Sequence, residues 1–131
     1  MHFSFKPIGF VRTQTGNGDI PRHWSISEVP GVIQIDAKYA GGLDDIAPGD
    51  DIVVLFAFHQ SPPFSAAMLK QTPPQKSRPK GVFSICSPVR PNPIGYSVLE
   101  VLSVSGSTIA VKGVDMFDGT PVLDIKPHVT R

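Results

Sequence analysis

Cysteine is almost absent from this chain of 131 residues, in which Cys86 is the only one. A single cysteine excludes an intramolecular disulfide and cannot form a CxxC metal or redox site. The histidines lack the spacing of metal ligands; they are His2, His23, His59 and His128. The sequence therefore predicts no metal site and a protein of a reducing compartment.

Long hydrophobic runs are absent as well. No segment approaches the roughly 20 apolar residues of a membrane span. The first residues, MHFSFKPIGF, contain no apolar core followed by a cleavage site. We therefore expect a soluble, unexported, cytoplasmic protein without membrane contact. The GxGxxG, GxxxxGK[ST] and GxSxG signatures are also missing, so neither a Rossmann-type nucleotide pocket nor a hydrolase elbow is expected.

Acidic residues are missing from one long part of the chain. No Asp or Glu occurs between Ile52 and Leu99, whereas that part contains Lys70, Lys76, Arg78, Lys80 and Arg90. The net charge of the whole chain is only +1 because the acids cluster before and after it. This asymmetry predicts a basic face for an anionic partner, above all a phosphate backbone. An ordinary solvated loop is the alternative.

The remaining pattern is that of a mainly β protein. GVIQIDAKY alternates, with Ile33, Ile35 and Ala37 on one face, as a half-buried strand does. The continuous apolar run 52–58 predicts a central strand buried on both faces. KGVFSICS is a further β-rich run, and Ser105-Gly106-Ser107 is a hairpin turn between strands 98–104 and 108–114.

Helical patterns are few and short. Only PPFSAAMLK and AGGLDDI favour a helix, and the segment KQTPPQKSRPKG is typical of a mobile loop. A length of 131 residues corresponds to one domain, residues 1–131. Many short strands with one long basic loop predict a small single-domain β-barrel, closed or nearly closed, with one or two short helices.

Four polar clusters interrupt the β pattern at expected strand ends. They are IPRHW, His59-Gln60, SPVRPNPIG and DMFDGTPVLDIKP. The last three also have a plainer structural interpretation, namely a structural histidine, a proline-rich connection and a bare Asp-Gly turn. In the last cluster, the alternation of a strand places Val122, Asp124 and Lys126 on one face. Asp124 and Lys126 could form an ion pair or act on an acceptor proton.

The third cluster has an unusual backbone. Three prolines surround Arg90 and Asn92, and each proline fixes its own φ and keeps the preceding residue out of the helical region. The segment is therefore a stiff, extended ribbon whose ordering entropy is partly removed from the unfolded chain. Such a ribbon is suited to holding a guanidinium and an amide in a binding site.

Two long motifs in the right order resemble those of a known family. GVFSICSPVRPNPIGYSVLEV and GVDMFDGTPVLDIKP resemble the paired motifs of the TsaA-like, or TrmO-like, family. KPIGFVRT, IPRH and FAFHQ extend the resemblance over nearly the whole chain. The resemblance implies a small non-Rossmann β-barrel methyltransferase, usually a homodimer with its cofactor near the subunit contact. It also implies methyl transfer from S-adenosylmethionine to the exocyclic nitrogen of threonylcarbamoyladenosine beside the anticodon of a tRNA.

The resemblance also implies site residues, position by position. Cofactor contacts fall on Pro21, Arg22, His23, His59, Gln60, Tyr96, Phe117, Asp118, Gly119 and Thr120. Arg90, Asn92, Asp124 and Lys126 match motif positions that we expect to face the pocket. A cation is suited to the carboxylate of the cofactor, and Arg22 or Arg90 could supply it. Asp124, His59 and Lys126 are the candidates for helping the acceptor nitrogen lose its proton.

The chain departs from the family pattern at two positions. Cys86 stands where the family commonly has Arg, and His23 where it has Gln. The basic residues Lys70, Lys76, Arg78 and Lys80 are the candidates for contacts with the anticodon arm. Two alternative functions stay open, namely the same cofactor with an acceptor other than tRNA, or a barrel that binds nucleic acid or a nucleotide without chemistry.

Overall fold

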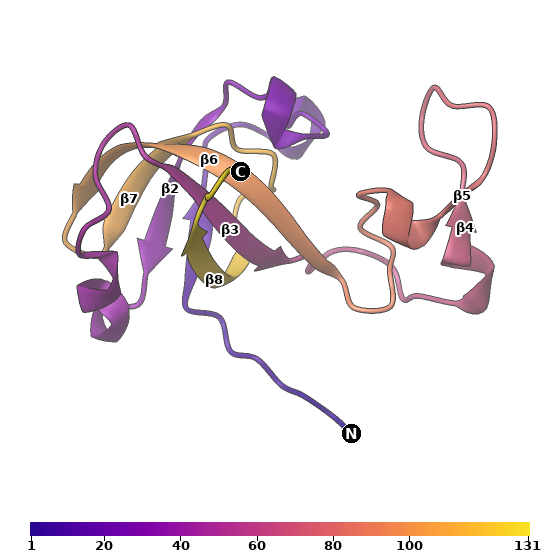
Figure 1. Ribbon diagram of the computed structural model, residues 1–131, viewed down its shortest axis with the longest axis horizontal. Coiled ribbons are helices and arrows are strands. Elements are labelled where there is room, and N and C mark those ends of the chain that lie inside the picture. The colour runs from indigo at the N-terminus through magenta and orange to yellow at the C-terminus, as the bar shows by residue number, and fades with distance from the viewer.

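Six antiparallel strands form a closed barrel in the computed structural model, which describes residues 1–131 (Figure 1). The order around the barrel is β1-β2-β7-β6-β3-β8. The bounds are β1 (Gly9–Arg12), β2 (Pro30–Ile35), β3 (Asp51–Ala57), β6 (Ile94–Ser105), β7 (Thr108–Lys112) and β8 (Pro121–Pro127). The predicted single-domain β-barrel is thus confirmed.

The smaller elements are two short strands and five 3₁₀ helices. The strands β4 (Lys70–Gln71) and β5 (Lys80–Gly81) form a separate ribbon. The helices are η1 (Asn17–Asp19), η2 (Trp24–Ile26), η3 (Ala37–Leu43), η4 (Ala66–Leu69) and η5 (Val82–Ser84). Both predicted helical segments contain or overlap a helix, η4 and η3, but as short 3₁₀ turns. None of the helices has the length and hydrophobicity of a membrane-spanning segment.

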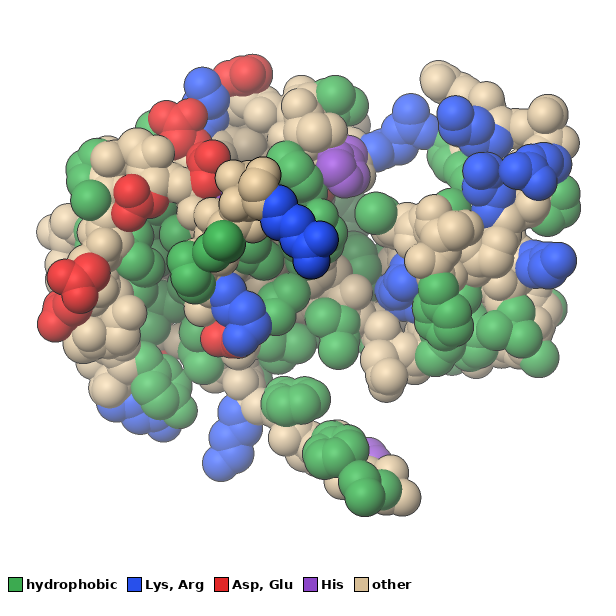
Figure 2. Space-filling model, in the orientation of Figure 1, with side chains coloured by type: hydrophobic (Ala, Val, Ile, Leu, Met, Phe, Trp, Pro, Cys, Tyr) green, Lys and Arg blue, Asp and Glu red, His purple; other side chains and the backbone are tan.

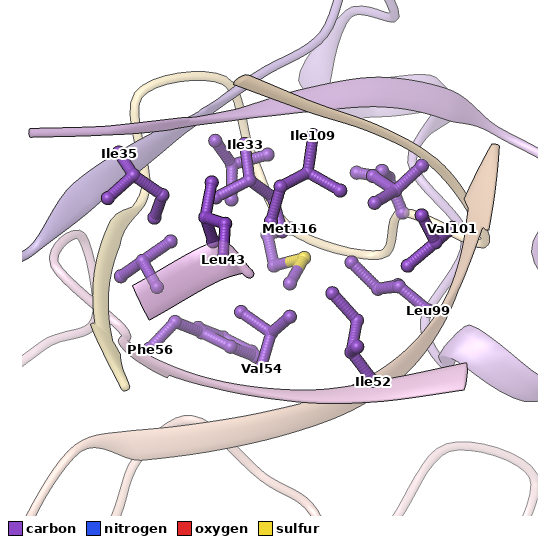
Figure 3. Close-up of a cluster of buried hydrophobic side chains, with 14 residues drawn as sticks. Ile33, Ile35, Leu43, Ile52, Val54, Phe56, Leu99, Val101, Ile109 and Met116 are labelled. Atoms are coloured by element: carbon purple, nitrogen blue, oxygen red, sulfur yellow. The ribbon is translucent and has the colours of Figure 1, made fainter. Parts of the chain in front are cut away.

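The core lies inside the barrel and follows from strand alternation. Inward residues of β3 and β6 are buried at every second position, and they meet those of β2 and β7 (Figure 3). Met116, from the connection before β8, is drawn near the middle of this cluster and is 3% exposed. Figure 3 also shows Leu43 of η3 among the core side chains. Two connections therefore help to fill the barrel.

Strand β3 differs from the prediction for its apolar run. Ile52, Val54 and Phe56 are buried, whereas Val53, Leu55 and Ala57 are only half-buried. A barrel strand has one face toward the core and one toward the outside, so a strand buried on both faces was the wrong expectation. The outer face of β3 is nevertheless apolar.

Strand β8 contains a bulge that overturns a second prediction. Val122 pairs with Phe56 and Asp124 pairs with Leu55, so Leu123 is the extra residue. Directly opposite residues share a face. Val122 therefore points inward with Phe56, while Asp124 and Lys126 point outward with Leu55 and Val53. The three residues predicted on one face are divided between two.

The other strand predictions hold in part. Ile33 and Ile35 are buried on one face of β2, whereas Ala37 is exposed at the start of η3. Gly106, with φ +59°, lies in the turn between β6 and β7, so the predicted hairpin is confirmed. KGVFSICS is a strand only at Lys80–Gly81 and continues as η5.

All long connections lie at one end of the barrel, except the connection between β2 and β3, which contains η3. The register shows that β1, β3 and β7 end there, and that β2, β6 and β8 begin there. We call it the loop end. It contains three connections, residues 13–29, 58–93 and 113–120.

The connection 58–93, here called the lobe, stands away from the barrel. It is the pink and salmon part on the right of Figure 1 and includes β4, β5, η4 and η5. Its ends meet where the amide of Phe58 donates to the carbonyl of Pro93 at 2.8 Å. The lobe therefore begins and ends at one point, as an extension of the β3–β6 ladder.

Candidate functional site

The predicted site residues come together mainly at the loop end. Pro21, Arg22 and His23 lie in connection 13–29, and Phe117–Thr120 lie in connection 113–120. His59, Gln60, Arg90 and Asn92 lie near the two ends of the lobe, and Tyr96 lies near the start of β6. Residues far apart in the sequence thus share one end of the barrel. Asp124 and Lys126 instead lie along strand β8.

A row of outward side chains connects β8 to this group. Asp124 pairs with Leu55, and Leu55 pairs with Tyr96, so the three form one row across β8, β3 and β6. Strand spacing places Asp124 about 10 Å from Tyr96. The ammonium of Lys126 lies 3.0 Å from the carboxylate of Asp124. We call the outward residues Tyr96, Leu55, Asp124 and Lys126 the floor.

An aromatic group borders the floor. The rings of Trp24 and Tyr96 meet edge to face at 6.3 Å, and the His23 ring lies 4.9 Å from Trp24. Nδ1 of His23 accepts a hydrogen bond from the Ser25 amide and so caps η2. Tyr96 remains 50% exposed. About half of the Tyr96 side chain is therefore accessible beside the half-buried Trp24.

Sequence reasoning missed a carboxylate beneath this aromatic group. Ser97 is fully buried on the inward face of β6, and its hydroxyl donates to Asp115 at 2.5 Å. Burial raises the pKa of Asp115 above its ordinary value of 3.8, while the Ser97 hydrogen bond and nearby His23 act in the opposite direction. No Lys or Arg pairs with Asp115. The available sequence signal was its position between two hydrophobic residues, Val114 and Met116, which the structure shows to be buried.

The Asp-Gly turn is confirmed, and most of its polar groups have partners. The amide and hydroxyl of Thr120 donate to the Phe117 carbonyl, and Gly119 adopts φ +84°, which favours glycine. The Asp118 carboxylate accepts from the Thr13 amide at 3.0 Å. Asp118 therefore joins two of the three connections and also lines an open groove along the end of β1 and the start of β2.

The RPNPIG ribbon has a structural reason for its glycine. A Cβ on Gly95 would lie 2.4 Å from the ring of Phe56, which packs edge to face on Phe58. Arg90 donates through one nitrogen to the carbonyls of Ile85 and Ser87, at 3.0 and 3.1 Å. Arg90 thus holds the lobe backbone, and only its remaining donors are free for a ligand.

Four polar side chains among the predicted cofactor contacts, besides that of Tyr96, make no hydrogen bond within the chain. They are those of Arg22, His59, Gln60 and Asn92, and all four are exposed. Because none has an internal partner, each is available to a ligand without loss of an existing bond. No group of three or more His, Cys, Asp or Glu side chains is placed to hold a metal ion.

The lobe carries the predicted basic residues. Figure 2 shows blue side chains gathered on the lobe at the right, with no red ones there, and an open gap between the lobe and the barrel. Lys70, Lys76 and Arg78 are exposed, and Lys80 is half-buried. The red side chains lie on the barrel. The charge asymmetry of the sequence is therefore also an asymmetry in space.

The comparisons with known proteins agree with one another. Residues 12–131 match the family model described as the tRNA-methyltransferase O N-terminal domain. An S-adenosyl-L-methionine-binding protein of Archaeoglobus fulgidus is 39% identical over 125 residues, which cover 94% of this chain and 87% of the relative. The human tRNA (adenine(37)-N6)-methyltransferase is 43% identical over 78 residues, which cover 60% of this chain and 18% of the relative.

Solved structures show the same fold. The crystal structure of TrmO from Pseudomonas aeruginosa superimposes with a TM-score of 0.78 at 31% identity and covers 98% of this chain. This chain spans 57% of that protein and 34% of another Archaeoglobus fulgidus relative, a probable S-adenosyl-L-methionine-binding protein.

The buried carboxylate gives a prediction about stability. Because its pKa is raised on folding, Asp115 binds a proton more readily in the folded than in the unfolded chain. Its contribution to stability therefore declines as pH rises from 3.8 through the raised pKa. The Asp115→Asn variant lacks this decline, so its free energy of unfolding relative to the wild type should increase with pH.

Urea unfolding between about pH 3.5 and pH 7 measures the difference. The exposed Asp19→Asn variant is the control for loss of one negative charge. Its free energy of unfolding relative to the wild type should change less with pH. A difference for Asp115→Asn that stays constant across this range would contradict the raised pKa.

Proposed function

Because this chain belongs to the tRNA-methyltransferase O N-terminal domain family, we propose that it transfers a methyl group from S-adenosylmethionine to the exocyclic nitrogen of an adenine in tRNA. The observation that carries the proposal is the convergence of three connections at the loop end, beside the floor. The finer proposal is that the acceptor is threonylcarbamoyladenosine next to the anticodon. Relatives named for the cofactor and for adenine methylation support the coarser proposal, methyl transfer from S-adenosylmethionine to an adenine of tRNA.

The residues at the loop end fit such a cofactor. The half-exposed Tyr96 ring, beside the fixed Trp24, offers a face for a purine. Arg22 is a free cation for a carboxylate, while His59, Gln60 and Asn92 offer uncommitted polar groups. When bound, S-adenosylmethionine supplies a methyl group on a positively charged sulfur. The set Pro21, Arg22, His23, His59, Gln60, Arg90, Asn92, Tyr96 and Phe117–Thr120 remains the proposed cofactor site.

Departures from the family pattern fall on different parts of this site. His23 has a local structural role, since its ring nitrogen caps η2. Cys86 is exposed in the lobe and supplies no charge. With Cys86 in place of an arginine, we propose that Arg22 and the free donors of Arg90 supply the cationic contact for the carboxylate of the cofactor.

Methyl transfer needs alignment and loss of the acceptor proton. Alignment contributes most of the rate in such displacements, and the stiff ribbon and the closed barrel supply fixed positions for the groups that align the reactants. We propose that Asp124, on the floor, accepts the proton of the acceptor nitrogen and that Lys126 holds the carboxylate in place. His59, exposed at the end of β3, is the second candidate for this role.

We propose further that the anticodon arm contacts Lys70, Lys76, Arg78 and Lys80 of the lobe, and that the protein acts as a homodimer in the cytoplasm. Ile94 and Tyr96 support the dimer, since they lie on the outer side of β6 and are 42% and 50% exposed. The cytoplasm is proposed because the proposed substrate is a tRNA.

The cofactor proposal predicts a selective effect of Asn92. Its amide makes no internal hydrogen bond, so Asn92→Ala should leave folding unchanged and weaken S-adenosylmethionine binding by roughly 5- to 50-fold. Calorimetric titration with the cofactor and with its demethylated product measures this. Asn17→Ala, equally an exposed asparagine, is the matched control. Equal affinity of the two variants would remove Asn92 from the site.

The acceptor proposal predicts a dependence on the modified base. The wild-type protein should methylate a tRNA that carries threonylcarbamoyladenosine and leave the same tRNA with plain adenine unmethylated. Transfer of radioactive methyl measures both reactions. Equal labelling of the two tRNAs would overturn threonylcarbamoyladenosine as the acceptor, but it would agree with an adenine of tRNA as the acceptor. No labelling of either, with cofactor binding intact, would favour another acceptor or a barrel without chemistry.

The lobe proposal predicts a change in salt dependence. Replacing Lys76, Arg78 and Lys80 together by Ala should reduce the slope of log Kd for tRNA against log salt by about 2 to 3, through loss of phosphate contacts. A variant that loses Lys6, Lys38 and Arg131 has the same net charge and should keep the slope. An unchanged slope in the lobe variant would place the tRNA elsewhere.

A further inference from the structure

Phe83 is the most exposed aromatic side chain of the protein, at 78%. It lies in η5 beside Val82, which is only 1% exposed. The Ser84 hydroxyl donates to the Gly81 carbonyl at 2.7 Å, and the Ile85 amide donates to the Val82 carbonyl. Because Val82 is anchored inward, the next residue of a 3₁₀ turn must point elsewhere. Phe83 is therefore held outward by local structure.

Phe83 closely follows the β4–β5 ribbon, which carries the exposed Lys70. Lys70 lies directly opposite Gly81 in the β4–β5 ribbon, and Gly81 is two residues before Phe83. A Cβ on Gly81 would meet nothing within 4 Å, so the ribbon is bare beside Lys70. On the other face, Gln71 points into the lobe, where its amide donates to the Met68 and Val89 carbonyls at 2.8 Å. Lys70 thus faces outward.

We infer that Phe83 is a stacking site for an unpaired base of RNA, with Lys70 bound to the adjoining phosphate. This inference rests on the proposed tRNA substrate. An exposed ring among cations is the usual platform for single-stranded nucleic acid, because every base has a stacking face. Sequence-specific RNA recognition also uses unpaired loop bases. The anticodon arm offers such bases.

Charge favours RNA over a second copy of this chain on this surface. The chain has no Asp or Glu between Ile52 and Leu99, so the lobe holds cations without carboxylates of its own. A two-fold contact centred on Phe83 would bring Lys70 near its own copy. Like charges brought together across an interface are unfavourable, whereas phosphates would neutralise them.

The experiment compares two RNA probes of equal length, an anticodon stem-loop and a fully paired hairpin closed by a tight tetraloop. Phe83→Ala should weaken stem-loop binding by roughly 5- to 100-fold and hairpin binding far less. The salt slope should stay unchanged, since no charge is removed. Phe83→Trp should restore binding, and Phe83→Leu should not. Phe5→Ala, with a ring 72% exposed in the amino-terminal arm, is the matched control.

Three outcomes overturn the inference. Equal weakening of both probes by Phe83→Ala would indicate a general structural effect, which the melting temperature of the variant would reveal. Full binding of the stem-loop by Phe83→Leu, together with a changed oligomeric mass of Phe83→Ala, would assign the ring to a contact between protein copies. Unchanged stem-loop binding by Phe83→Ala, when the triple lobe variant loses binding, would reject stacking alone. If the triple variant binds normally too, the lobe proposal itself fails.

Discussion

Closure of the barrel by antiparallel pairing is the constraint on which the rest of the structure depends. Each of the six strands is antiparallel to both neighbours, so the strands alternate in direction around the ring. Strand ends therefore alternate with strand starts at each rim. This topology brings connections 13–29, 58–93 and 113–120 to one rim, although they are far apart in the sequence. A site composed of all three follows from closure.

Local breaks in the strand pattern then determine which side chains point outward near this rim. The bulge at Leu123 turns Asp124 and Lys126 outward, and it brings Asp124 into register with Leu55 and Tyr96. Without the extra residue, Asp124 would lie on the inward side with Val122, among core residues, where a charge is costly. Gly95 acts in a different way, since its missing side chain lets Phe56 and Phe58 pack beneath the start of β6. Both devices lie within motifs already visible in the sequence.

The sequence predicts the class of fold well and the orientation of individual side chains less well. Alternation in β2 and the Gly106 turn are local signals, so they hold in the structure. The apolar run of β3 does not reveal that its outer face is only half-covered, because coverage depends on distant segments. The bulge depends on pairing with β3, and the burial of Asp115 depends on Ser97 and on connection 13–29. These are tertiary effects without a local signature.

The lobe shows a different balance of forces from the barrel. Its two strands, β4 and β5, pair with each other in a ribbon that is separate from the barrel sheet. Its interior is held by hydrogen bonds from the side chains of Gln71 and Arg90 to backbone carbonyls. The lobe is therefore ordered within itself, while its position relative to the barrel depends mainly on the backbone at its root. An RNA that contacted both the lobe and the floor would add contacts across the gap seen in Figure 2. Binding of such an RNA would then fix the geometry between the two parts.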